Sequence, residues 1–364
     1  MDKKNILFIC IFLQSFFSFS QSKDSVNVGS FESQFSDSIA LLNEKSELLK
    51  SSRDAYNTAL EFLKNKQYDD ALNQFSLAIS IDSLFVEAYS GRAKAYEKIN
   101  SELAIKDYLF IYSLDSSDFS PLYSVANLHF NANKEEAKKI YFEILNLNES
   151  EHKALSQLGA IAFIEENYQE AESFFTRSIA ISTTANSLND RGSCYRKMEK
   201  NDLAIKDYLA AIALNSNLAF IYNNLASIYA AKGDNEKAMS YFDLAISKDN
   251  EYVLAYNNKA SLLMKSKNYD EASTLIEKVL NIDSNYAPAY NNRGVISHQF
   301  KKYNDAISNF DKAISINNDY AKAYLNRGIS KQMIRDIDGS CQDWNKAKEL
   351  GIVVAKKYLS NDCE

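Results

Sequence analysis

The sequence predicts an all-α fold, a right-handed α-solenoid of about nine helix-turn-helix repeats with a capping helix at each end. Asparagine recurs every 34 residues at Asn224, Asn258, Asn292 and Asn326, and alanine keeps the same spacing at neighbouring positions. A fixed period of this length is typical of stacked copies of one supersecondary unit. The composition is 46% hydrophobic with only 2 prolines, which favours packed helices over a disordered chain.

The N-terminal residues 1–20 have the pattern of a secretory signal peptide. Lys3 and Lys4 precede a short apolar run, and small residues follow it up to Ser20. The run is shorter than the roughly 20 residues that a membrane-spanning helix needs. We therefore expect cleavage before Gln21 and a periplasmic or secreted chain. The alternative is a chain tethered to a membrane by an uncleaved N-terminal segment.

Both ends of the array are expected to carry polar caps, because terminal repeats otherwise expose their apolar faces. Residues 21–50 predict a flexible lead followed by an N-terminal capping helix over 38–50. The nine repeats occupy 51–351. Gly351 ends the ninth repeat, and 352–364 predicts a C-terminal capping helix.

Residues 219–248 show the pattern of one repeat. Two runs of apolar residues have the spacing of a helix face: Tyr222, Leu225, Ala226 and Tyr229 in the first, and Ala238, Phe242 and Ala245 in the second. Gly233 and Asp234 between the runs predict a helix stop and a turn. Two short helices joined by a tight turn form an antiparallel pair.

This pattern resembles the tetratricopeptide repeat of secreted Gram-negative proteins. Positions are counted from the first residue of each copy, so Ala219 is position 1 of the copy described above. Small residues occupy positions 8 and 20 of all nine copies, and most copies have an aromatic residue at position 24. Position 8 is Ala59, Ala93, Ala126, Gly159, Gly192, Ala226, Ala260, Gly294 and Gly328. Small residues allow the helix backbones to approach, and the ring fills the space between helices. The resemblance implies a solenoid that binds other proteins.

The family's proline near position 32 is absent. Polar residues stand there instead, and we expect them to cap the next helix. They include Ser83, Ser216, Asn250, Ser284 and Asn318.

Arginine at position 7 varies together with a polar residue at position 23. The pairs are Arg92 with Asp107, Arg191 with Asp207, Arg293 with Asn309, and Arg327 with Asp343. Either the arginines form an anion site, or each forms an ion pair inside its repeat, which the rule that buried charges occur in pairs favours. Lys259 lies opposite Leu275, and its ammonium is expected to reach solvent.

The resemblance also indicates where a ligand would bind. In the family, the first helix of each repeat lines the concave face through positions 2, 5, 6, 9 and 12. An amide offers a donor and an acceptor together, so evenly spaced amides can grip an extended peptide backbone. The alternative is a solvated row without a ligand. The candidate peptide-binding residues are Asn224, Asn258, Asn292, Asn326, Asn223, Asn257, Asn291 and His298.

The sequence contains no catalytic motif that we recognise. We therefore expect no enzymatic activity, no cofactor and no metal site. The net charge of −7 argues against nucleic acid as a partner, because nucleic-acid binding needs a basic face.

Three cysteines remain beyond the leader. The C-terminal segment looks like that of secreted repeat proteins, and this resemblance implies a Cys341–Cys363 disulfide that ties the capping helix to the last repeat. The alternative is two free thiols. Cys194 is expected to be buried and inert.

Together these patterns predict a non-enzymatic interaction scaffold of the cell envelope that binds an extended peptide or protein segment on its concave face. The alternative is a structural component of a multiprotein envelope assembly that docks through its convex face or its ends. The identity of the partner does not follow from the sequence.

Overall fold

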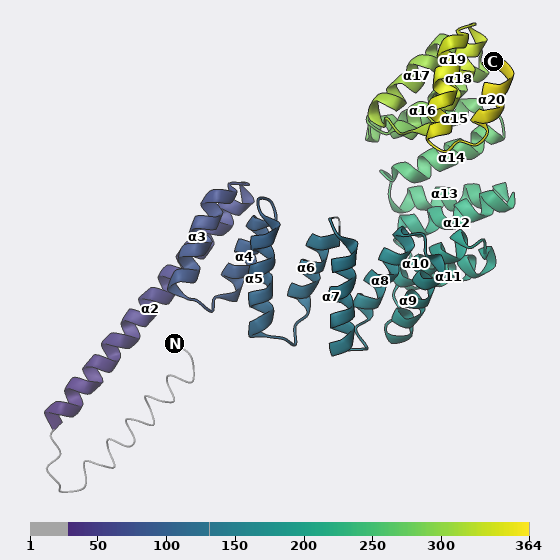
Figure 1. Cartoon of the computed structure of the whole chain (residues 1–364). Helices are drawn as coiled ribbons and strands as arrows, with labels where there is room; N and C mark the ends of the chain where they lie inside the picture. The colour runs from purple at the N-terminus through teal and green to yellow at the C-terminus, as the bar shows by residue number, and fades with distance from the viewer. Residues whose placement is uncertain (1–27, 131, 364) are drawn as a thin grey trace. The chain divides into compact units, whose positions relative to one another are not determined.

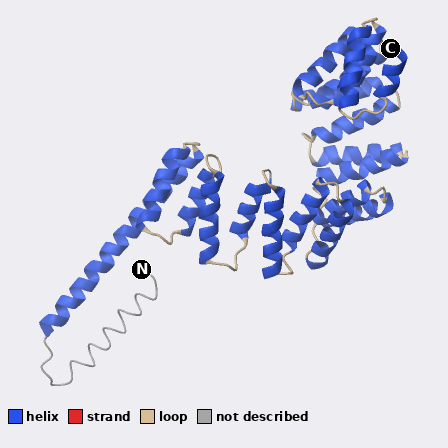
Figure 2. Ribbon diagram, in the orientation of Figure 1, coloured by secondary structure: helices blue, strands red, loops and turns tan. Residues whose placement is uncertain are grey.

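The computed structural model describes residues 28–130 and 132–363, and all regular structure in these ranges is α-helical (Figure 1, Figure 2). The all-α prediction is confirmed. The predicted signal peptide at 1–20 lies outside the described residues, as do the first residues of the expected lead. The chain divides into two compact units, Met1–Ile140 and Tyr141–Glu364.

The described helices alternate as first and second helices of nine consecutive repeats, followed by one C-terminal helix. The first helices of the pairs are α2 (Val28–Lys64), α4 (Val86–Tyr96), α6 (Ser120–Phe130), α8 (His152–Ile164), α10 (Ala185–Lys197), α12 (Ala219–Lys232), α14 (Val253–Lys265), α16 (Ala287–Gln299) and α18 (Ala321–Met333). The second helices are α3 (Tyr68–Ile81), α5 (Ser101–Leu114), α7 (Lys134–Leu147), α9 (Tyr168–Ile181), α11 (Asn201–Leu214), α13 (Asn235–Lys248), α15 (Tyr269–Ile282), α17 (Tyr303–Ile316) and α19 (Ile337–Glu349). The last helix is α20 (Ala355–Asp362).

The N-terminal end differs from the expectation. The capping helix expected over 38–50 is not a separate element, and the residues of the expected lead from Val28 onward are helical. Both belong to α2, a single helix of 37 residues that continues into the first repeat. No glycine or proline stands between Ser38 and Lys64, so nothing in the sequence ends the helix there.

The core repeats itself in each pair. The small residues at positions 8 and 20 and the ring at position 24 are buried: in the pair α10 and α11, Ala204 and Tyr208 have no exposed surface. A β-carbon added at Gly192 would lie 2.8 Å from Cε1 of Tyr208. The first and second helices therefore pack too closely at this point for any side chain larger than hydrogen.

The turns between repeats are capped by a different residue from the expected one. No side-chain cap is made at the start of α12, α14 or α16, whose N-cap residues are Leu218, Tyr252 and Tyr286. An Asp or Asn at the end of the preceding helix accepts the hydrogen bond instead, from the backbone N–H two residues later. Examples are Asn215 with Asn217 at 3.0 Å, Asp249 with Glu251 at 2.9 Å and Asp283 with Asn285 at 2.9 Å. The short Asx side chain reaches its own turn more readily than the next helix.

The turn inside each full-length repeat contains a left-handed residue at position 15. Gly233, in the turn that the sequence predicted, adopts this conformation with φ of 81°. The equivalent residues of other repeats adopt it without being glycine: Lys66, Glu166, Glu199, Lys267, Lys301 and Arg335. A residue with a β-carbon is strained in this region of φ and ψ.

Replacing Lys267 with glycine is expected to raise the free energy of unfolding by about 0.5–1 kcal/mol, because glycine relieves the strain at φ of 63°. Urea denaturation followed by circular dichroism measures the change. Lys278→Gly, inside α15, is the matched control and should lower stability by about 1 kcal/mol. A loss of stability in both variants would contradict the strain argument.

Candidate functional site

The four predicted asparagines form a row across one face of the second unit. Asn224, Asn258, Asn292 and Asn326, here called the amide row, occupy the sixth position of α12, α14, α16 and α18. These first helices contact one another directly in sequence order. Because each repeat presents its sixth residue in the same way, the four side chains lie on one continuous face, and all four are half-buried.

Each member of the amide row donates a hydrogen bond to the repeat before it. The side-chain nitrogen of the row residue contacts the side-chain oxygen of the asparagine at position 5 of the preceding first helix. The four bonds are Asn224 to Asn189 at 2.9 Å, Asn258 to Asn223 at 3.0 Å, Asn292 to Asn257 at 2.8 Å and Asn326 to Asn291 at 2.9 Å. These bonds connect neighbouring repeats and orient the row.

The asparagines at position 5 lie beneath the row. Asn223, Asn257 and Asn291 are only 5–7% exposed, and Asn189 is equally buried. Sequence reasoning placed the first three in the ligand site and did not identify Asn189. The geometry shows them as hydrogen-bond partners that hold the row, since a buried amide oxygen needs a donor. The sequence offered one signal for this contact. Adjacent asparagines recur in successive repeats, and each hydrogen-bonded pair consists of residues 35 positions apart.

The amide row retains hydrogen-bonding capacity on its open side. Asn224, Asn258 and Asn326 each use one of their two N–H groups on the preceding repeat. The nitrogen of Asn292 contacts both Asn257 and, at 3.2 Å, Oγ of Ser261 on the preceding repeat. Among the described residues, the side-chain oxygens of Asn224, Asn258 and Asn326 accept no hydrogen bond, while that of Asn292 accepts a long one from Asn291 at 3.5 Å. At Asn224, Asn258 and Asn326 a free acceptor therefore lies beside a free donor, which matches the C=O and N–H of an extended peptide backbone.

The row begins beside an acidic residue. Asp190 holds position 6 of α10, where the later repeats have asparagine, and Oδ1 accepts from the amide of Asn189 at 3.1 Å. Burial raises the pKa of Asp190 above its ordinary value, and the bond from Asn189 opposes that shift only in part.

His298 lies on the same face, at position 12 of α16. Its Nδ1 is 2.9 Å from Oγ of Ser330 on α18, and its ring packs edge-on against Tyr303. Burial lowers the pKa of His298 below its ordinary value, so the ring is neutral at pH 7. The side chain is therefore a neutral hydrogen-bonding group that also connects two repeats.

The arginines at position 7 are paired inside the protein, as the structural reading of the sequence predicted. Arg92, Arg191 and Arg327 each bind both carboxylate oxygens of the aspartate at position 23, and Arg293 donates to Asn309 at 2.6 Å. Their remaining N–H groups contact position 25 of the preceding repeat, for example Arg327 with Asp311 and Arg191 with Thr176. Bidentate pairing satisfies the guanidinium fork, so these residues do not form an anion site.

The expectation for Lys259 was wrong. Its side chain is only 12% exposed, and its ammonium lies 2.7 Å from Oδ1 of Asp243 on the preceding repeat. Asp243 is the position 25 residue of that repeat, so Lys259 makes the same contact between repeats as the arginines. A cation held against the packed helices is paired rather than left alone.

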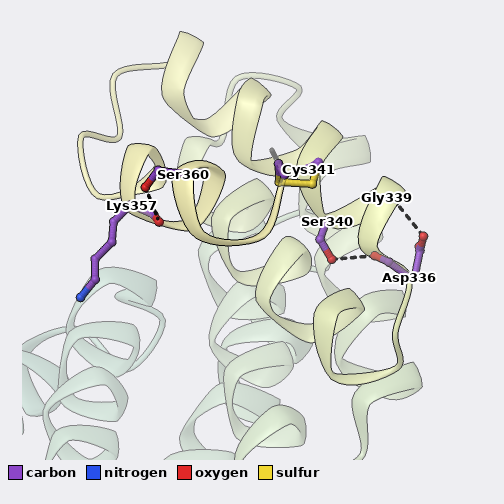
Figure 3. The surroundings of a disulfide bond; sticks show 7 residues. Asp336, Gly339, Ser340, Cys341, Lys357 and Ser360 are labelled. Atoms are coloured by element: carbon purple, nitrogen blue, oxygen red, sulfur yellow. Dashed lines mark hydrogen bonds between the residues drawn. A yellow bond between two sulfur atoms is a disulfide. The ribbon is translucent and has the colours of Figure 1, made fainter.

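Cys341 on α19 and Cys363 after α20 are joined as a disulfide, with their Cα atoms 5.7 Å apart (Figure 3). The start of α19 is held next to it, where Asp336 accepts from the N–H of Gly339 and from the hydroxyl of Ser340. The third thiol, Cys194, is free and fully buried, and burial raises its pKa to about 12. A thiol with that pKa is unreactive at neutral pH.

Two kinds of feature are absent from the described residues. No group of three or more His, Cys, Asp or Glu side chains there is placed to hold a metal ion. In the same ranges, no helix combines the length and apolar character needed to cross a membrane.

Comparison with protein families identifies the repeats. Two models described as tetratricopeptide repeat match residues 229–292 and 287–320, and one described as TPR repeat matches 192–233. Together these segments cover residues 192–320, which include Asn224, Asn258 and Asn292 of the amide row but not Asn326.

Individual proteins show the same likeness. Human tetratricopeptide repeat protein 6 is 28% identical over 171 residues, which is 45% of this chain and 33% of that protein. The match thus spans about a third of the length of the human relative.

Two solved structures share the fold. The Cut9–Hcn1 hetero-tetramer of the APC/C is 12% identical over 86% of this chain and 76% of that chain, with a TM-score of 0.58. A tetratricopeptide repeat protein from Parabacteroides merdae is 19% identical over 76% of this chain and 97% of that chain, with a TM-score of 0.50. At these identities the likeness concerns the fold alone.

Proposed function

Because this chain is a tetratricopeptide repeat protein, we propose that it is a non-enzymatic scaffold whose amide row binds an extended segment of a partner protein. The observation that supports the proposal is the geometry of the row: four half-buried amides in register, each anchored on the preceding repeat, three of which keep a free donor and a free acceptor. An anchored amide loses little conformational entropy when it binds a ligand, which favours affinity.

The proposed mode of binding is recognition of the peptide backbone rather than of particular side chains. Amide groups in register can pair with successive C=O and N–H groups of an extended chain. Phe220 and Pro288, at position 2 of α12 and α16, flank the row and offer apolar contact beside it. Among the residues at position 2 of α12, α14, α16 and α18, only Lys322 is basic. A neutral, mixed surface of this kind suits a protein partner.

We also propose that the protein acts outside the cytoplasm. The leader pattern at 1–20 directs export, and a disulfide between Cys341 and Cys363 persists only in an oxidising compartment. The partner would then be a protein of the periplasm or the cell surface.

The test uses peptides selected by phage display against the protein and measured by fluorescence anisotropy. Asn258→Ala with Asn292→Ala removes two row amides and should weaken binding roughly 10- to 100-fold, since each lost hydrogen bond costs about 0.5–1.5 kcal/mol. N-methylation of the peptide backbone at successive residues should weaken binding to a similar degree. Substituting peptide side chains should have smaller effects.

Asn57→Ala is the matched control, because Asn57 holds position 6 of the first repeat but is exposed and lies outside the row. Circular dichroism and thermal unfolding check that the double variant keeps its fold. Selected peptides that bind the double variant as tightly as the unaltered protein would refute the amide row as the site. Docking through the convex face or the ends of the array would then be the better explanation.

A further inference from the structure

The N-terminal half of α2 carries a face that no other described residue covers. Every residue from 33 to 51 is exposed, and Figure 1 shows this part of the helix projecting beyond α3. Six large apolar side chains lie on it and are 43–67% exposed; we call them the α2 stripe, and they are Phe35, Ile39, Leu41, Leu42, Leu48 and Leu49. Exposed apolar side chains gathered in this way mark an interaction surface.

The stripe continues a face that is already an interface. Its heptad spacing, Phe35, Ile39, Leu42 and Leu49, leads to Tyr56, seven residues after Leu49, which packs in the first repeat. From Phe35 to Leu49 the spacing alternates between four and three residues, with Ser46 as the one polar seam position in that stretch. This is the pattern of a helix that packs along another helix. The occupant of the stripe is therefore a helix.

A charge in the middle of the stripe determines which helix fits. Lys45 lies three or four residues from Leu41, Leu42, Leu48 and Leu49, so its stem emerges among four leucines. A helix packed on the stripe covers this ammonium, which then needs a carboxylate, because a covered charge without a partner is costly. The occupant must supply an Asp or Glu at that point.

A second copy of this chain does not meet that requirement. In a parallel pair, Lys45 of one copy faces Lys50 of the other. In the antiparallel pair that sets Ile39 against Leu49, Lys45 faces Lys45. Both arrangements place like charges across the seam.

A membrane surface also fits poorly. Between residues 33 and 51 the helix has three acidic and two basic side chains: Asp37, Glu44 and Glu47, and Lys45 and Lys50. Helices that lie on membranes carry a polar face rich in Lys and Arg.

We propose that the α2 stripe is a docking site for an amphipathic helix of another protein, with acidic residues beside its apolar seam and one carboxylate pairing with Lys45. This site lies in the first unit, whereas the amide row lies in the second, so the two proposals stand or fall separately.

The test uses two designed 21-residue peptides with leucine at both seam positions of each heptad. One has glutamate at the flanking positions, and its control has lysine there. In fluorescence anisotropy, the glutamate peptide should bind the protein at least 10-fold more tightly than the lysine peptide. Lys45→Glu should reverse the preference, and Leu42→Ser should weaken binding at least 10-fold. Glu47→Lys, on the opposite side of the helix, should leave it unchanged.

Leu42 is exposed, so its substitution leaves the fold intact, and circular dichroism verifies this. Sedimentation adds an independent measurement: the unaltered protein should not associate through α2, whereas Lys45→Leu should produce a dimer. Equal affinity for the two peptides, or no binding of either, would overturn the proposal. So would a dimer of the unaltered protein that Leu42→Ser dissociates, or binding to phosphatidylcholine vesicles that depends on the stripe.

Discussion

Replacing Arg191 with leucine is expected to lower the free energy of unfolding by about 3–5 kcal/mol, because the change leaves the Asp207 carboxylate buried without its partner. Two short bonds join the pair, at 2.7 Å and 2.8 Å, and Asp207 is only 4% exposed. Arg191 also donates to Thr176 of the preceding repeat. Urea denaturation at pH 7 measures the loss.

Two further variants separate the stranded charge from lost packing. Arg191→Leu combined with Asp207→Leu removes both charges and should recover most of the stability, since apolar side chains can replace a buried ion pair at little cost. Arg293→Leu should cost less than Arg191→Leu, because the partner Asn309 is neutral. If all three variants were equally unstable, packing of the long arginine stem would be the dominant contribution.

Removing the disulfide with Cys341→Ser and Cys363→Ser is expected to destabilise the last repeat by roughly 3 kcal/mol, the chain-entropy value for a loop of this length. The bond joins residues 22 positions apart. It holds α20 over the ninth repeat, where Tyr358 stacks on the fully buried Trp344 with ring centroids 5.0 Å apart. Without the bond α20 frays, and the indole of Trp344 gains access to water.

Hydrogen exchange of α20 and intrinsic tryptophan fluorescence report this change, because the chain contains only 1 tryptophan. Adding a reducing agent to the unaltered protein should reproduce the effect, while Cys194→Ala should not alter the response to reduction. Alkylation of the exported protein should find no reactive thiol until it is unfolded. Three free thiols in that protein would contradict both the disulfide and the proposed oxidising compartment.

Most of the fold follows from local pattern. The 34-residue period, the small residues at positions 8 and 20 and the ring at position 24 predicted the pairs and their core, because each repeat meets only its neighbours. The joint variation of positions 7 and 23 predicted ion pairs such as Arg191 with Asp207. These contacts lie within one repeat, so each copy of the sequence contains both partners.

Contacts between repeats were harder to predict. The bond from Asn258 to Asn223 joins different positions of different copies, and so does the contact of Lys259 with Asp243. Reading the copies in a column shows which residue types recur, but it does not show which position of one copy touches which position of the next. The left-handed conformation at position 15 could not be predicted at Lys267 and Lys301, because lysine, unlike glycine, does not indicate a positive φ.

The sequence by itself determined the helical pairs, their order and the composition of their core, since a helix face and a close helix contact depend on residues a few positions apart. Only the tertiary structure decided how the surface polar groups are used. It buried Asn223, Asn257 and Asn291 under the amide row and extended α2 past its repeat, leaving Lys45 among exposed leucines. These outcomes depend on which surfaces the stacking of repeats covers, and burial is a property of the assembled helices rather than of any single segment.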